Sequence, residues 1–248
     1  MIKIQKPTAP QVLLDNKATW TQNLLDAINT YGGYNKIPES EKNSLLSHYR
    51  HKDIQTALFA SSHYKCAFCE CIPGESSHIE VEHFEPKSLY PDLAFEWDNL
   101  LPSCRICNEE KADADTRTNP IINPAIEDPE QFLTYSFLRI KPLAGSGQEQ
   151  KAQQTIEVCN LNCERLYSAR SALMKSLTEY IDELKDKINL VSEADTDQKR
   201  KVRITKLKNS LAVIDSLTTA ESAFSGYTKW FIQECPEYQE AKRIAASR

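Results

Sequence analysis

Four cysteines of the 248-residue chain stand in two pairs with the same spacing. They are Cys66 and Cys69, then Cys104 and Cys107, with the members of each pair three positions apart. Thiolates at this spacing in a tight turn face one ion, and two such turns complete a tetrahedral site of four sulfurs. We therefore predict one structural Zn²⁺ ion with no coordination position open to a substrate. The alternatives are buried free thiols, a redox-active pair, or replacement of one ligand by Cys71.

A glutamate–histidine pair, Glu82 and His83, lies between the two cysteine pairs. Neighbouring residues in a strand point to opposite sides, so Glu82 could hold a cation while His83 acts on a water molecule. A histidine pKa of about 6.5 suits the removal of a proton from that water. Asn108 directly follows Cys107, and its amide oxygen is a ligand that Mg²⁺ accepts beside a carboxylate and waters. The sequence predicts phosphodiester hydrolysis with a catalytic Mg²⁺ or Mn²⁺ held by Glu82 and Asn108.

Three more polar residues of this segment have assignable roles. Asn99 would either hold the loop that follows the histidine or orient the imidazole through its amide. Lys111 lies on the same predicted helical face as Asn108 and is suited to a phosphate. Glu80 lies on the same strand face as Glu82 and could assist it. Without the cysteine pairs around them, the histidine would be read as structural and Glu82 as a surface carboxylate.

The elements that must position these residues are short. Strands are predicted at residues 78–83 and 89–95. A short helix is predicted to begin near Asn99 or Pro102 and to contain Cys107. A further strand pair is predicted within residues 131–142. The cysteine-bearing segment is poor in long periodic patterns, which is expected where a metal replaces part of a core.

Helical patterns flank this segment on both sides. A helix is predicted at residues 19–30, and another is predicted to be capped by Ser40. After a polar, glycine-containing loop at residues 143–150, Asn162 could cap a long helix with apolar residues three and four positions apart. The segment 192–197 would end that helix before a second one. An aromatic cluster is predicted to pack at its end: Phe224, Tyr227, Trp230 and Phe231.

The composition is that of a folded globular protein, with 40% hydrophobic and 26% charged residues. No apolar run approaches the roughly 18 residues of a membrane helix. The first residues show no secretory signal pattern, so we expect a cytoplasmic protein. The net charge of −5 argues against binding of nucleic acid over the whole surface, but it leaves room for a local basic patch.

One such patch is predicted on the second C-terminal helix. Six cations occur there within ten positions: Lys199, Arg200, Lys201, Arg203, Lys206 and Lys208. They could bind nucleic acid or an acidic partner, or they could form the solvated face of an amphipathic helix. The solvated face is the preferred interpretation.

The segment from Cys66 to Lys111 resembles the HNH endonuclease motif, in the variant that four cysteines and a zinc ion stabilise. In this resemblance Glu82 and His83 match the first motif element, Asn99 the middle one and Asn108 the last. It implies a ββα-metal fold, with His83 as general base and with Glu82 and Asn108 as ligands of the catalytic metal. Many HNH enzymes have aspartate where this chain has Glu82, and the extra methylene could shift the metal or its preference.

Longer stretches of the sequence resemble a narrower family, the HNH nuclease subunits (PtuB) of Septu-type anti-phage systems, which also occur in retron defence operons. The matching stretches are Glu-His-Phe-Glu-Pro-Lys-Ser at 82–88, Trp-Asp-Asn-Leu at 97–100, Cys-Asn-x-x-Lys at 107–111 and Asn-Pro-Ile-Ile-Asn-Pro at 119–124. The resemblance implies a partner ATPase of the ABC/SMC class (PtuA-like). In retron systems it also implies a reverse transcriptase with its RNA–DNA product.

These observations together predict an α+β protein with a ββα-metal core. Residues 1–62 would form an N-terminal helical segment, 63–145 the HNH nuclease core with its zinc knuckles, and 146–248 a C-terminal helical region. The expected function is cleavage of DNA or RNA as the effector of a phage-defence complex. The alternatives are a non-enzymatic zinc-ribbon adapter that docks an ATPase, and a stand-alone restriction or homing-type HNH nuclease.

Overall fold

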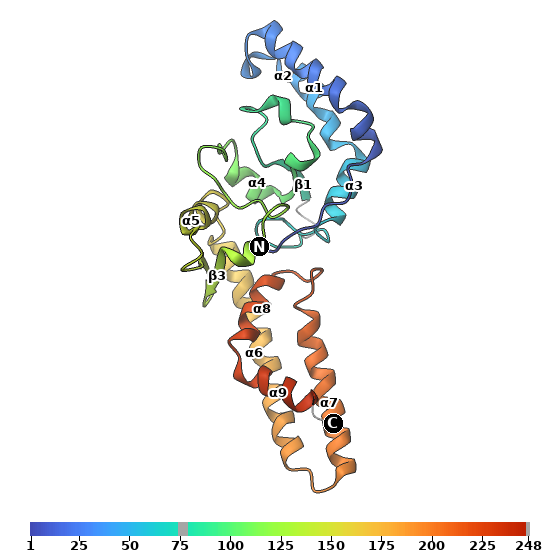
Figure 1. Cartoon of the computed structure of the whole chain (residues 1–248), viewed down its shortest axis with the longest axis vertical. Helices are drawn as coiled ribbons and strands as arrows, with labels where there is room; N and C mark the ends of the chain where they lie inside the picture. The colour runs from blue at the N-terminus through green and yellow to red at the C-terminus, as the bar shows by residue number, and fades with distance from the viewer. Residues whose placement is uncertain (74–78, 247–248) are drawn as a thin grey trace. The chain divides into compact units, whose positions relative to one another are not determined.

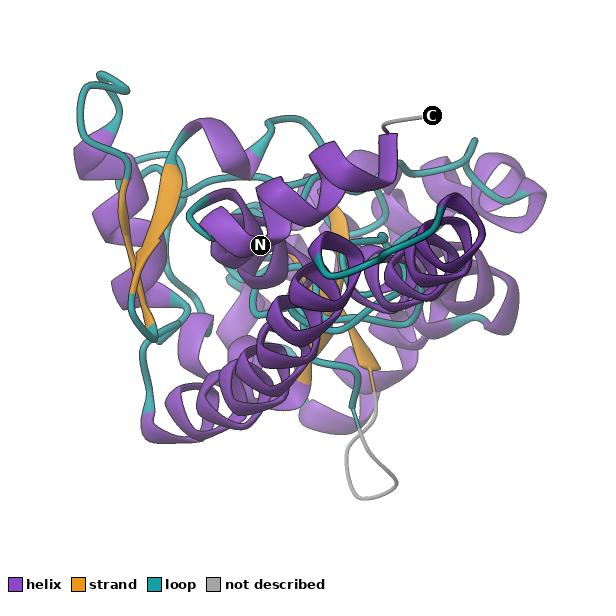
Figure 2. Cartoon of the chain, turned by 90° about the horizontal axis from the view of Figure 1, so that it is seen from below, coloured by secondary structure: helices purple, strands orange, loops and turns teal. Residues whose placement is uncertain are grey.

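The structure is a computed structural model that describes residues 1–73 and 79–246 (Figure 1). The chain divides into two compact units. The first unit contains residues 1–134 and 140–162, and the second contains residues 135–139 and 163–248. Helices and two small sheets make up the described chain, which confirms the α+β class (Figure 2). Among the described helices, none combines the length and the hydropathy that a membrane span requires.

Three helices begin the first unit. They are α1 (Gln11–Tyr31), α2 (Glu39–Leu46) and α3 (Lys52–Ala60), separated by the short 3₁₀ helices η1 (Tyr34–Lys36) and η2 (Ser47–Arg50). Gly32 ends α1 in the left-handed conformation with a φ of 73°, which a residue without Cβ adopts at little cost. The helix predicted at residues 19–30 is confirmed and is longer than expected. The predicted Ser40 cap is wrong, because α2 begins at Glu39 directly after Pro38.

A small antiparallel sheet follows, formed by β1 (Ile79–His83) and β2 (Leu100–Cys104). Helix α4 (Arg105–Lys111) begins directly after β2, and α3 and α4 both pack against the two strands. The sheet therefore lies between these two helices. The alternation in β1 explains this arrangement, because Val81 is buried in the apolar core with residues of the N-terminal helices while Glu80 and Glu82 point to the other face.

Two predicted elements of this region are wrong. Residues 89–95 form no strand but contain the 3₁₀ helix η3 (Pro91–Leu93), and the second strand is β2 instead. Pro91 cannot donate a hydrogen bond to a strand ladder, whereas its fixed φ suits the start of a helical turn. The predicted helix starts at Arg105 rather than near Asn99 or Pro102, because the latter residues belong to η4 (Trp97–Asn99) and β2.

A hairpin and a helix come next in the chain. The strand pair predicted within 131–142 is confirmed as β3 (Leu133–Ser136) and β4 (Arg139–Pro142), and α5 (Glu149–Val158) follows the predicted polar loop. The short 3₁₀ helix η5 (Pro129–Gln131) precedes the hairpin.

The second unit is helical. Its helices are α6 (Glu164–Ser192), α7 (Asp197–Ser216), α8 (Ser225–Gln233) and α9 (Pro236–Ala246). Helices α6 and α7 run side by side, and the predicted break between them at 192–197 is confirmed (Figure 1). Their shared core is apolar and includes Leu184, Leu207 and Ile214. The predicted Asn162 cap is wrong, because Cys163 occupies the cap position of α6.

The predicted aromatic cluster is confirmed in the second unit. The ring of Tyr227 lies 5.6 Å from that of Trp230 and 5.2 Å from that of Tyr135, and Phe224 and Phe231 pack against the same core.

Candidate functional site

The four predicted cysteines meet in one buried cluster. Cys66 and Cys69 come from the loop after α3, while Cys104 ends β2 and Cys107 lies in the first turn of α4. Their sulfur atoms all lie within 4.8 Å of one another. Four thiols that converge at this separation form the donor set of a tetrahedral zinc site, so the residues fit a Zn²⁺ ion. The prediction that these four residues cluster is confirmed.

The protonation of this cluster favours a bound cation. Burial raises the pKa of the Cys66 thiol, whereas contacts with Cys107 and the other thiols lower the pKa of Cys104. A divalent cation would stabilise all four residues as thiolates, which a buried site without a cation does not.

Cys71 lies beside the cluster. Its sulfur is 3.2 Å from that of Cys69, and its side chain is only half-buried. It is not part of the group of four sulfurs, so the geometry favours Cys66 as the ligand that pairs with Cys69.

His83 is the last residue of β1, on the face that packs against the N-terminal helices. Its Nε2 atom lies 2.9 Å from the carbonyl oxygen of Ala94. A carbonyl only accepts hydrogen bonds, so Nε2 bears the proton and Nδ1 is left as the basic nitrogen. The imidazole is 3% exposed and packs perpendicular to the Tyr49 ring, with the two ring centroids 4.6 Å apart. Burial, and then the charge of Lys87, lowers its pKa to about 3, so the imidazole is neutral near pH 7.

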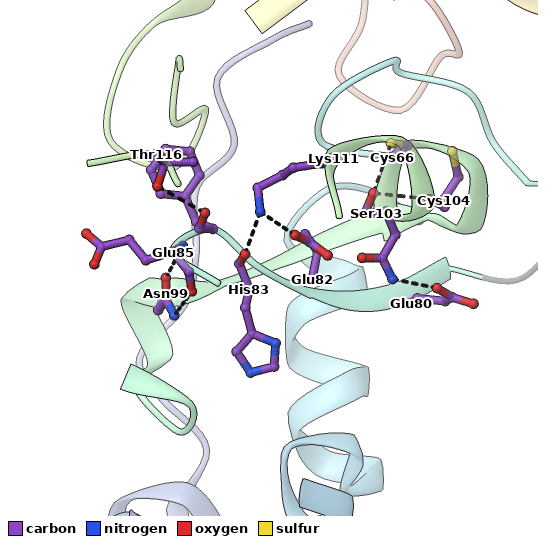
Figure 3. Close-up of polar contacts among 12 residues, drawn as sticks. Cys66, Glu80, Glu82, His83, Glu85, Asn99, Ser103, Cys104, Lys111 and Thr116 are labelled. Carbon is purple, nitrogen blue, oxygen red and sulfur yellow. Dashed lines mark hydrogen bonds and ion pairs between the residues drawn. The ribbon is translucent and has the colours of Figure 1, made fainter. Parts of the chain in front are cut away.

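Asn99 holds the loop that follows His83. Its Oδ1 accepts a hydrogen bond from the backbone N–H of Glu85 at 2.7 Å, and its Nδ2 donates to the carbonyl of Glu85 at 3.0 Å (Figure 3). The same Nδ2 donates to the carbonyl of Leu93 at 3.1 Å. These bonds connect the loop after β1 to the segment that supplies the Ala94 carbonyl. The first of the two roles predicted for Asn99 therefore agrees with the contacts, and the imidazole is oriented by Ala94 instead of by the amide.

Glu82 lies on the other side of β1 and forms a buried ion pair. Its Oε1 accepts a hydrogen bond from Lys111 Nζ at 2.6 Å, and the same ammonium donates to the carbonyl of His83 at 2.9 Å (Figure 3). Burial raises the pKa of Glu82, and Lys111 opposes that shift. Lys111 is 1% exposed, so the prediction that it faces a phosphate is wrong: Glu82 and the His83 backbone use its donors.

Asn108, which was predicted to share a metal ion with Glu82, contacts the carboxylate of Glu80. Its Nδ2 donates to Glu80 Oε2 at 2.6 Å, while Glu82 pairs with Lys111. Glu80, to which sequence reasoning assigned only an assisting role, is thus the partner of Asn108. Two carboxylates and an amide on one face of the sheet are the hard oxygen donors that Mg²⁺ and Mn²⁺ prefer.

Two residues of the site were missed by sequence reasoning. Tyr49 contacts His83 from η2, and Ala94 fixes the imidazole through a backbone atom. Neither contact has a local signal, because Tyr49 belongs to the N-terminal helices and a carbonyl contact does not depend on the type of residue.

Comparison with known proteins identifies relatives. No family model matches the chain. The Septu protein PtuB of Bacillus thuringiensis is 33% identical over 186 residues, which cover 74% of this chain and 64% of that protein. The Septu protein PtuB of Bacillus mycoides (strain KBAB4) is 24% identical over 264 residues, which cover 90% of this chain and 85% of that protein. The chain therefore spans a little less than two thirds of the length of the Bacillus thuringiensis protein.

Proposed function

We propose that this chain, which is similar to two Septu proteins named PtuB, is a metal-dependent endonuclease of the HNH type. Its role would be that of the effector subunit of an anti-phage defence complex. The observation that supports this most strongly is the geometry of His83, a neutral imidazole whose Nε2–H donates to the Ala94 carbonyl and whose Nδ1 lone pair is left to accept a proton. The order of β1, β2 and α4 agrees with the ββα arrangement that the HNH resemblance implies.

In the proposed mechanism His83 is the general base. Nδ1 takes a proton from the attacking water while the new bond to phosphorus forms and the bond from phosphorus to the 3′ oxygen breaks. The Nε2–H bond to the Ala94 carbonyl stabilises the imidazolium that results. Asn99 maintains this geometry because it hydrogen-bonds both to Glu85, two residues after His83, and to Leu93, the residue before Ala94. His83 is the last residue of β1. A phosphate bound beyond the end of this strand would be within reach of side chains from both faces of the sheet.

The acidic face would hold the catalytic metal. Glu82 and Asn108, with Glu80, are the proposed ligands, and a bound Mg²⁺ or Mn²⁺ would stabilise charge on the scissile phosphate and the departing 3′ oxygen. Lys111 contacts Glu82 through Oε1, so we assign the second carboxylate oxygen to the metal. The resemblance to HNH enzymes and the chemistry of these donors support this assignment.

The proposed Zn²⁺ has a structural role. The four cysteines connect the loop after α3 to the junction of β2 and α4, and this junction determines where Asn108 and Lys111 lie relative to β1. All four zinc positions would be filled by protein sulfur, so the zinc and the catalytic metal have separate functions.

The burial of His83 supports one competing function. An imidazole that is 3% exposed and packed against Tyr49 is also what a structural histidine presents. In that case the chain would be a zinc-ribbon adapter that docks a partner without performing chemistry. A stand-alone restriction or homing-type HNH nuclease would keep the chemistry but not the partner.

A PtuA-like ATPase of the ABC/SMC class is the proposed partner, because the relatives are named as Septu proteins. A retron reverse transcriptase with its RNA–DNA product is the second candidate. Co-expression of the chain with each candidate, followed by affinity purification and size-exclusion chromatography, tests this. Failure of the ATPase to co-elute would favour the stand-alone nuclease.

The test of the chemistry compares wild type with His83→Ala on DNA and RNA in the presence of Mg²⁺ or Mn²⁺. Loss of a general base is expected to lower the cleavage rate by about 10²- to 10⁴-fold. The control is His48→Ala, since His48 is also packed on an aromatic ring, Trp20, at 4.6 Å. Equal cleavage by wild type and His83→Ala would refute the mechanism, and absence of cleavage by any variant in the full complex would favour the adapter.

A further inference from the structure

The ring of Tyr49 brings two cations next to His83. The Arg50 guanidinium carbon lies 5.2 Å from the ring centroid and Lys87 Nζ lies 5.9 Å from it, while the centroid of the imidazole lies 4.6 Å from the same ring centroid. Arg50 ends η2 and Lys87 lies in the loop after β1, so segments distant in sequence place two positive charges near the proposed base.

These two cations differ from the other basic residues of the site. Lys111 pairs with Glu82, and Arg117 pairs with Glu85. Within residues 1–73 and 79–246, neither Arg50 nor Lys87 forms an ion pair with a carboxylate. A cation at the surface needs no partner, but Lys87 is half-buried, and burial lowers its pKa while the charges of Glu82 and Asp113 oppose that shift. Because neither carboxylate forms an ion pair with Lys87, its ammonium is available to a further anion that binds beside it.

Both cations lie over the aromatic ring that packs against the proposed base. An anion held by either cation would therefore lie near His83. Lys111 lies on the other side of β1 and is already occupied by Glu82, so it does not offer a competing anion site.

We propose that Lys87 and Arg50 form a phosphate-binding subsite that positions the backbone phosphate of the substrate beside His83. The inference rests on the proposed nuclease function and specifies the residues that hold the substrate. The ligand class is a nucleic-acid phosphodiester, read by its charge and not by its bases. The lysine supplies a point charge, and the guanidinium supplies a planar pair of donors for two phosphate oxygens. Lys87 and Arg50 are positioning residues in this assignment.

The competing interpretation is that both cations only pack on the aromatic ring. A cation–π contact contributes to stability and has no consequence for phosphate binding. The two interpretations differ in a measurable way, because a residue that binds a phosphate releases a counterion when nucleic acid binds. Its removal therefore lowers the dependence of the dissociation constant on salt.

The experiment uses the full-length chain with His83→Ala, with zinc retained and no Mg²⁺ or Mn²⁺ added, so that binding is measured without cleavage. The probes are a fluorescein-labelled DNA duplex and an RNA of the same sequence, titrated at several NaCl concentrations. Lys87→Gln and Arg50→Gln are each expected to weaken binding about 3- to 10-fold on every sequence and to reduce the salt slope by about 1. Lys87→Arg should restore both quantities.

Lys36→Gln is the matched control. Lys36 is exposed on η1 in the same unit, and its replacement removes the same charge. If Lys87→Gln and Arg50→Gln bind both probes with the affinity and salt slope of this control, the subsite is refuted. If those two variants lose affinity but wild type cleaves neither probe with Mg²⁺ or Mn²⁺ in the full complex, the nuclease proposal fails and the subsite stands.

Discussion

Replacement of Lys111 by methionine tests the buried ion pair at the centre of the candidate site. The change removes the 2.6 Å bond to Glu82 and the 2.9 Å bond to the carbonyl of His83. The carboxylate, which is 5% exposed, is then left without its partner. Removal of one member of a buried pair costs about 3–5 kcal/mol of the free energy of unfolding. The lower end of this range is expected, because Lys87 also stabilises the Glu82 carboxylate.

The second change in the cycle is Glu82→Gln, alone and combined with Lys111→Met. The double variant contains no unpaired buried charge, so it should recover most of the stability lost by Lys111→Met. Urea unfolding at constant m value gives each free energy, with zinc retained and no Mg²⁺ present. The control is Arg105→Met, which breaks the exposed pair of Arg105 with Glu109 on the same helix and should leave the unfolding midpoint unchanged.

Two results would refute this reasoning. The first is a midpoint for Lys111→Met that equals that of Arg105→Met, which would mean that the pair is solvated. The second is strict additivity in the double variant, which would mean that Lys111 and Glu82 contribute independently.

Three further predictions concern the metal, the loop and the basic helix. Cys104→Ser should lower bound zinc below about one per chain and lower the Tm, and an unchanged Tm in a zinc-free protein would contradict the four-cysteine site. Asn99→Ala removes three hydrogen bonds, so it should lower the free energy of unfolding in urea by about 3 kcal/mol and abolish cleavage. The control Asn162→Ala removes the partners of both backbone groups of Ile140, so it should destabilise the fold while the folded fraction still cleaves. Charge reversal across 199–201 should leave nucleic-acid affinity unchanged in anisotropy titrations, because Lys199 already pairs with Asp195 on this solvated face; a loss of affinity with folding intact would identify a binding surface.

The cysteine cluster was predictable because its signal is local. Two residues three positions apart determine most of the geometry of each pair, and the coordination chemistry of zinc requires that two pairs converge. The long helix α6 was predictable for a related reason, since its buried apolar residues repeat with the helical period over many turns. In α7 the repeat is limited to Leu207, Leu211 and Ile214 in the second half of the helix.

The prediction of a strand at 89–95 was wrong because the same residues are compatible with a strand and with a helical turn. Leu93 and Phe95 are apolar and alternate as in a strand, but Pro91 starts a helical turn, and Phe95 is completely buried in the core of the N-terminal helices. Tertiary packing decided between the two, and a window of a few residues contains no information about it.

The choice of partner for Asn108 has a geometric explanation. Glu80 is opposite Ser103 in the sheet, and α4 begins two residues after Ser103, so the first turn of the helix lies level with Glu80. One helical turn later the chain has advanced by about 5 Å, and two strand residues advance by about 7 Å, so Lys111 becomes level with Glu82. Asn108 with Glu80 and Lys111 with Glu82 are therefore successive contacts of one helix–strand register.

This register makes the choice of metal ligands a property of the fold. Glu80 and Asn108 form one helix–strand contact, and Lys111 and Glu82 form the next one. A metal bound by Glu82 and Asn108 would therefore take one ligand from each of the two contacts. Spacing in sequence places all of these side chains on one face but does not assign the pairs, because the offset between helix and strand depends on the residue at which α4 begins. The cysteine cluster includes Cys104 and Cys107 on either side of that start. The proposed structural metal would thus determine which carboxylates meet the helix, and with them the position of the proposed catalytic metal.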